Sequence, residues 1–208
     1  MQPFTIVTAV AAPLDIAKID TGMIVPGRFQ RLPRRSGHSD YARVFLHDLR
    51  FDEHEQPRPD FILNRPAYQK TGLLVTGPDF GCGSSRESAA YATLDFGVRA
   101  LIGASFGDVY RGNCMQNGVL TIVLPQSEIN GLLAQLQAAP GAIMTVDLSQ
   151  QSVIAPDGTR HSFDIDASRK ERLLKGLDDV GVTLQHLAQI EAFEAQYRTE
   201  MPWLASMI

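Results

Sequence analysis

Short apolar segments alternate with glycine, proline and polar residues along most of the chain. Six of these segments have the length and composition of strands. They lie at 73–76, 98–102, 119–124, 143–148, 152–155 and 159–165. Pro156-Asp157-Gly158 separates the last two and predicts a hairpin turn. The stretch 105–118, rich in glycine and asparagine, predicts a loop.

Helical patterns lie between and after these segments. The glycine-rich stretch Asp79 to Glu87 leads into an alanine-rich segment, which predicts strand, turn and helix in succession. A second helix is expected at 127–138, before Pro140-Gly141. Beyond Asp166, a candidate helix cap, leucine and valine recur at helical spacings. The pattern predicts one mixed α/β domain over 1–208, with a helical C-terminal extension over 166–208.

Composition and charge exclude several classes of protein. Hydrophobic residues make up 44% and charged residues 20%, which is typical of a globular domain and not of collagen, a coiled coil or a disordered chain. The chain has 19 basic and 23 acidic residues and a net charge of −4, so we expect no nucleic-acid partner. The start of the chain lacks an uninterrupted apolar stretch, and no segment approaches about 18 apolar residues. We therefore expect a cytoplasmic protein without a membrane partner.

The two cysteines, Cys82 and Cys114, limit the metal chemistry of the chain. They cannot form a disulfide framework, and no C-x-x-C pair is present for a structural zinc site. An iron–sulfur cluster takes three or four cysteine thiolates, so this chain alone cannot carry one. We expect no metal site and no cofactor in this chain.

The turn from Gly81 to Glu87 is the most informative part of the sequence. Ser84-x-x-Glu87 fits a capping box, so one interpretation is that the turn only starts a helix. The other interpretation is an anion site, because N–H groups at a helix start and the fork of Arg86 can bind a carboxylate or phosphate. The spacing matches no dinucleotide fingerprint, P-loop or nucleophile elbow. A carboxylate is the ligand that fits best.

Other side chains are weaker candidates for a functional site. Cys82 would be a nucleophile at a helix start if a histidine assisted it, but no histidine spacing indicates a partner. Cys114 is expected to pack in the interior. The basic cluster Arg28, Arg31, Arg34 and Arg35 is typical of a solvated face, and in a carboxylate-binding protein it becomes a candidate substrate-facing loop.

The residues at this turn resemble a known family. Phe80 to Glu87 reads Phe-Gly-Cys-Gly-Ser-Ser-Arg-Glu and resembles the FGCGSSRE motif of the small subunit of 3-isopropylmalate dehydratase, in the aconitase superfamily. Further similarities cover nearly the whole chain. They are Ile19-Asp20-Thr21 with Ile24-Val25-Pro26, Ser105 to Asp108 with Asn113-Cys114 and Asn117-Gly118, and Leu174 to Leu184, which resembles the tail of the longer bacterial form.

The resemblance implies a fold, a partner and a reaction. The fold would be the swivelling β/β/α domain that aconitases carry as their last domain. The partner would be a large subunit that holds a [4Fe–4S] cluster, and the reaction would be dehydration and rehydration of a hydroxy dicarboxylate in leucine biosynthesis. Ser84 would be the catalytic base, acting as an alkoxide. Arg86 would hold a substrate carboxylate with support from Ser85, and Arg28 would contact substrate.

Two positions depart from the family pattern. Ser88 stands where a histidine is usual, and Gly22 stands where a second aspartate is usual. They leave open a related dehydratase acting on another alkyl malate, such as 2-methylmalate. A non-catalytic dicarboxylate-binding module and, more remotely, a hydrolase using Cys82 also stay open.

Overall fold

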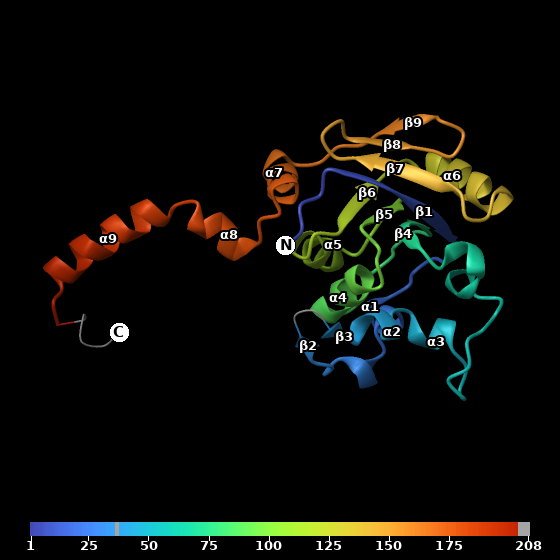
Figure 1. Cartoon of the computed structure of the whole chain (residues 1–208), viewed down its shortest axis with the longest axis horizontal. Helices are drawn as coiled ribbons and strands as arrows, with labels where there is room; N and C mark the ends of the chain where they lie inside the picture. Colours follow the sequence, from blue (N-terminus) through green and yellow to red (C-terminus); the bar gives the residue numbers. More distant parts are fainter. Residues whose placement is uncertain (36–37, 204–208) are drawn as a thin grey trace.

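The computed structural model describes residues 1–35 and 38–203 and contains a seven-stranded mixed sheet (Figure 1). The strand order is β6-β5-β4-β1-β7-β8-β9. The first four strands are mutually parallel, and β7, β8 and β9 each run antiparallel to the preceding neighbour. Their bounds are β1 Ile6–Leu14, β4 Thr71–Thr76, β5 Ala100–Gly103, β6 Leu120–Val123, β7 Ile143–Asp147, β8 Ser152–Ile154 and β9 Arg160–Ser162; a separate pair is β2 Arg34–Arg35 and β3 His38–Ser39.

Helices cover both faces of the sheet (Figure 1). One face carries the short helices that follow β1 and the helices that connect the parallel strands, and the other face carries α6. The helices are α1 Thr21–Ile24, α2 Tyr41–Val44, α3 His47–Arg50, α4 Glu87–Asp95, α5 Asp108–Gln116, α6 Gln126–Ala138, α7 Ala167–Lys175, α8 Asp179–Leu184 and α9 Leu187–Glu200; the 3-10 turns are η1 Gly27–Phe29, η2 Ile62–Asn64 and η3 Pro66–Tyr68.

Successive residues of the central strands enter two different cores. In β4, Leu74 packs with the cluster under α4 and α5, whereas Leu73 and Val75 pack with the cluster under α6. All six residues of β4 are therefore buried. Burial on both faces explains why Leu73, Leu74 and Val75 are consecutive apolar residues instead of an alternating pattern.

The six strands expected from the sequence are confirmed, and the expected loop at 105–118 is wrong. Residues 108–116 form α5, which buries Tyr110 and Cys114 one helical turn apart against the sheet. Gly112 suggested a turn, but it lies on the outer side of α5, where a Cβ would meet no atom within 4 Å. Packing of one apolar stripe has outweighed the weak helix propensity of glycine and asparagine.

The C-terminal helical pattern divides into three helices. The Asp166 side chain accepts a hydrogen bond from the Arg169 N–H at 3.0 Å, which confirms the expected cap. Gly176, at φ +68°, ends α7. Leu173 anchors α7 to the body, but α8 and α9 bury no residue and lead away from it (Figure 1). Within residues 1–35 and 38–203, no helix is long and apolar enough to span a membrane.

Candidate active site

The loop after β4 is held between the segments that follow β1 and β5. The Gly81 N–H donates to the Ile19 carbonyl at 2.7 Å, and the Gly107 N–H donates to the Phe80 carbonyl at 3.0 Å. Three loops thus meet at the carboxyl ends of adjacent parallel strands. This edge is where open α/β sheets place their ligands.

Thr21 fixes the part of this loop that leads to α4. Its N–H donates to the Cys82 carbonyl at 3.0 Å, and its hydroxyl donates to the Ser84 carbonyl at 2.7 Å. Thr21 is itself buried, and Asp20 pairs with Cys82 as a parallel bridge. The turn therefore takes its conformation from a segment about 60 positions earlier in the chain, which local sequence patterns do not reveal.

Gly81 is required by packing inside the protein. Its φ is +76°, and a Cβ built on it would lie 2.1 Å from Cδ1 of Tyr110. Gly107 is equally confined, because its Cβ would lie 2.2 Å from the Gly81 carbonyl oxygen. Gly83, at φ +86°, is exposed. Gly81 thus allows the loop to pack closely against Tyr110 and does not face a ligand.

The capping box expected at Ser84 and Glu87 is wrong. The helix begins at Glu87, Arg86 occupies the N-cap position, and no side chain caps the helix start. The reason is the pairing with Thr21, which binds the Cys82 and Ser84 carbonyls and so holds this part of the chain outside the helix. Within the described chain, the hydroxyls of exposed Ser84 and Ser85 make no hydrogen bond. Both are available for another role.

Arg86 is half-buried and is the one cation in the turn 81–87. With the Gln30 amide oriented to satisfy both groups, its oxygen accepts from Nε and Nη1 of Arg86 at 2.9 and 3.1 Å. The Val25 carbonyl accepts from Nη1 at 3.4 Å. Sequence patterns missed Gln30 entirely; the resemblance of Ile24-Val25-Pro26 to a family segment was the one signal pointing to this region.

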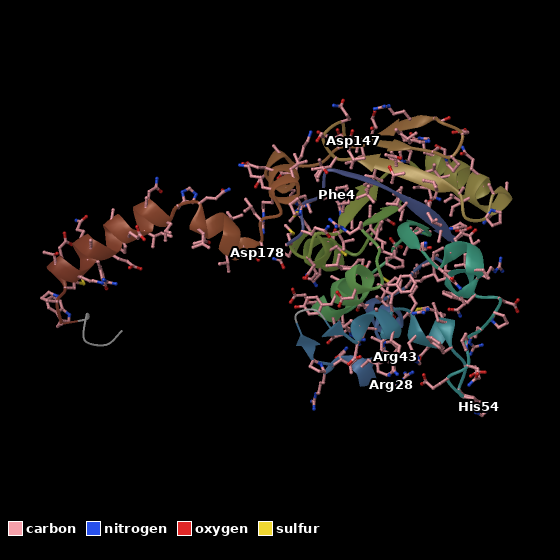
Figure 2. The ribbon with its side chains drawn as sticks, viewed as in Figure 1. Phe4, Arg28, Arg43, His54, Asp147 and Asp178 are labelled. Atoms are coloured by element: carbon pink, nitrogen blue, oxygen red, sulfur yellow. The ribbon has the colours of Figure 1, made fainter. Side chains whose placement is uncertain are left out.

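Arg28 lies in η1, and its side chain pairs with Asp48 and not with the turn 81–87. Both of its terminal nitrogens donate to the Asp48 carboxylate, Nη1 at 2.9 Å. This hydrogen bonding raises the pKa of Arg28 and lowers the pKa of Asp48 to about 2. Figure 2 shows Arg28 on the side of the sheet that carries α1 to α3. Within the described chain no contact joins it to residues 84–86, so its substrate role stays a prediction.

Other parts of the predicted chemistry fall outside this turn. The side chains of Arg34 and Arg35 lie outside the described residues. Cys114 is fully buried, and burial raises the pKa of its thiol to about 12, which fits a packing role. His47 bonds to Asp48 and Glu55, so nothing in its contacts supports a hydrolase using Cys82.

Comparisons with known proteins agree with this architecture. Residues 1–127 match the family described as the aconitase C-terminal domain, residues 131–167 match one described as LeuD_N, and residues 179–206 match the C-terminal domain of the 3-isopropylmalate dehydratase small subunit. A crystal structure of 3-isopropylmalate dehydratase from Methanocaldococcus jannaschii superposes with a TM-score of 0.63 at 20% identity, covering 90% of this chain and 99% of that one. This likeness confirms the expected fold.

Closer relatives share nearly the full length of the chain. The 3-isopropylmalate dehydratase small subunit of Dinoroseobacter shibae is 46% identical over 98% of this chain and 100% of its own length. The small subunit of the same name from Rhodospirillum rubrum is 47% identical over 98% of this chain and 97% of its own length. At this identity and coverage, the chain belongs to the family of 3-isopropylmalate dehydratase small subunits.

Proposed function

We propose that this protein is the small subunit of a cytoplasmic hydro-lyase that interconverts 2-isopropylmalate and 3-isopropylmalate in leucine biosynthesis. The observation that carries the proposal is the full-length similarity to small subunits of that name. The exposed Ser84 and the hydrogen-bonded Arg86 in the same turn support it. The relatives named above favour this substrate over 2-methylmalate.

The reaction needs a base and a cation at neighbouring positions, and this turn supplies both. Arg86 binds one substrate carboxylate through its Nη2 N–H groups, which are free within the described residues and donate charge-assisted hydrogen bonds to a carboxylate oxygen. Ser84, as an alkoxide, takes the proton from the carbon next to a carboxylate and becomes a neutral hydroxyl, while the hydroxyl on the adjacent carbon leaves with its bonding pair as hydroxide. Adding water back to the double bond with the opposite placement of hydrogen and hydroxyl completes the isomerisation.

A serine hydroxyl does not ionise unaided near neutral pH, so the site must stabilise its anion. Two features of this turn place positive charge there: the Arg86 guanidinium and the free N–H groups at the start of α4. Ser85, whose hydroxyl is also unengaged within the described residues, donates a supporting hydrogen bond. Arg28 contacts substrate only when its pair with Asp48 opens.

The iron–sulfur cluster of this reaction belongs on a large-subunit partner. The residues of this chain do not fit such a group: it has two cysteines, and Cys114 is buried with its pKa raised to about 12. Across the described residues, no three His, Cys, Asp or Glu side chains are grouped to hold a metal ion. We therefore assign to this chain the proton transfer and carboxylate binding, and to the partner the activation of the leaving hydroxyl.

The proposal is tested by co-expressing this chain with the large subunit from the same source and measuring turnover of several alkyl malates. We expect an isolated complex of the two subunits whose kcat/KM is at least about 10-fold higher for 3-isopropylmalate than for 2-methylmalate, since even one buried methylene is worth about 10-fold. Turnover by this chain alone, or preference for 2-methylmalate, would contradict it.

A further inference from the structure

The position of the Arg86 side chain is set by a single segment, 22–30, that follows β1. The Gln30 amide oxygen accepts from Nε and Nη1, and the Val25 carbonyl accepts from Nη1. Gly22 lies directly against the guanidinium, because a Cβ at this position would be 2.9 Å from Nη1 and 3.5 Å from Cζ. The segment thus provides two acceptors and a space that any side chain at position 22 would occupy.

All of these contacts are electrically neutral. No ion pair involving Arg86 is present in the described part of the chain, and the carboxylate beyond Gly22, that of Asp20, is bonded to the Gly22 and Met23 N–H groups at 2.7 and 2.8 Å. Arg86 is therefore oriented by hydrogen bonds to neutral acceptors and not by an ion pair. Its Nη2 N–H groups stay free, among the described residues, for an incoming anion.

Arg28 shows the opposite arrangement in the same protein. Its guanidinium is held by the Asp48 carboxylate, whose pKa that contact lowers to about 2. A carboxylate orients an arginine and neutralises it at once, whereas an amide oxygen orients it and leaves its charge intact. The contrast indicates why a glutamine, and not a glutamate, serves at position 30.

We propose that Gln30 is the positioning residue for Arg86, and that Gly22 provides the space in which the oriented guanidinium lies. The inference rests on the proposed function, since it assigns Arg86 the task of binding a substrate carboxylate. Gln30 does not touch the reacting atoms. It acts through Arg86, by fixing the direction of the guanidinium before substrate arrives without forming an ion pair with it.

The test compares Gln30→Glu, Gln30→Met and Gly22→Ala in the complex with the large subunit. A glutamate at position 30 would pair with Arg86 and compete with substrate, a methionine there would remove the acceptor, and a Cβ at position 22 would displace Nη1. We expect Gln30→Glu to raise the KM for 3-isopropylmalate about 10-fold, with kcat within about 2-fold. A change of about 10-fold is the low end for losing a hydrogen bond between Arg86 and the charged substrate carboxylate. Gln30→Met and Gly22→Ala should raise KM less.

Two controls separate positioning from a general disturbance. Gln69→Glu makes the same change at another exposed glutamine, which follows η3 and has no side-chain contact with Arg86, and should leave KM unchanged. In an Arg86→Lys background, Gln30→Met should have no further effect on KM, because lysine cannot take up the two-point contact. The variants at position 30 should keep the wild-type Tm, since Gln30 is exposed.

The outcomes distinguish this role from the proposed function itself. If Arg86→Lys raises KM but Gln30→Glu behaves as Gln69→Glu does, the positioning role is overturned and the function stands. If the wild-type complex does not turn over 3-isopropylmalate, or if Arg86→Lys leaves KM unchanged, the function assigned to this turn is overturned and the role of Gln30 with it.

Discussion

Replacing Gly81 by alanine should displace the loop that carries Ser84 and Arg86 from its packing position against Tyr110. The added methyl group would lie 2.1 Å from Cδ1 and 2.3 Å from Cγ of Tyr110. The ring cannot swing aside, because Tyr110 is 1% exposed and its hydroxyl lies 2.7 Å from Oγ1 of buried Thr93. The loop must therefore move.

The free energy of unfolding should fall through two effects. Holding a non-glycine residue at φ +76° costs about 1–2 kcal/mol, and forcing a methyl group into a packed core costs about 1–3 kcal/mol. The sum, about 2–5 kcal/mol, is a large part of the ~5–15 kcal/mol that stabilises a typical protein. We expect the variant to fold at room temperature with a clearly lower urea midpoint.

Two other glycines are matched controls for the two effects. Gly158 has φ +87° with no atom within 4 Å of a Cβ, so Gly158→Ala should cost only the backbone term. Gly112 in α5 has neither constraint, so Gly112→Ala should stabilise the protein by up to about 1 kcal/mol. Urea unfolding followed by circular dichroism measures all three. If Gly81→Ala costs no more than Gly158→Ala, the packing of Gly81 on Tyr110 does not stabilise the loop.

Asp48, the C-terminal helices and the two candidate reactive side chains each give a further test. Asp48, with its pKa lowered to about 2, adds stability that is present above its unfolded pKa of about 4 and is lost as pH falls through 2. In urea unfolding at several pH values, Asp48→Asn should therefore reduce the loss of stability between about pH 4 and about pH 2. At pH 7 this variant should cost at most about 1 kcal/mol, because the pair with Arg28 is half-exposed. Ending the chain after Leu177 should lower Tm by no more than about 4 °C in calorimetry, since α8 and α9 bury no residue; a larger loss would show that they stabilise the body. In the complex, Arg86→Lys should raise KM by about 10-fold or more while Cys82→Ser stays near wild type, and the reverse result would favour a thiol mechanism.

The strands were predictable because their burial is a local property of the sequence. Leu73 to Val75 of β4 are consecutive apolar residues since both faces of the strand are covered, and Gly72 and Gly77 flank this apolar segment. α5 was missed for the opposite reason. Gly112 and Asn113 favour turns locally, and the burial of Tyr110 and Cys114 that stabilises the helix depends on distant strands.

The candidate site was predictable in its residues but not in its geometry. Ser84 and Arg86 were identified from a motif, yet the capping box was wrong because the hydrogen bonds from Thr21 decide where α4 begins. Gln30 was missed because its hydrogen bonds with Arg86 join two segments that lie far apart in the chain and meet only in the folded protein. Neither contact leaves a periodic signal in the sequence.

The central claim is that Ser84 is the base of a two-subunit hydro-lyase, and turnover by Ser84→Ala in the complex tests it most directly. The Ser84 side chain makes no hydrogen bond within the described residues and does not cap α4, so this change should leave Tm and binding of the large subunit at wild-type values. Loss of a general base should lower kcat by at least about 10²-fold. A stable, fully assembled Ser84→Ala complex that turns over 3-isopropylmalate at the wild-type rate would contradict the account.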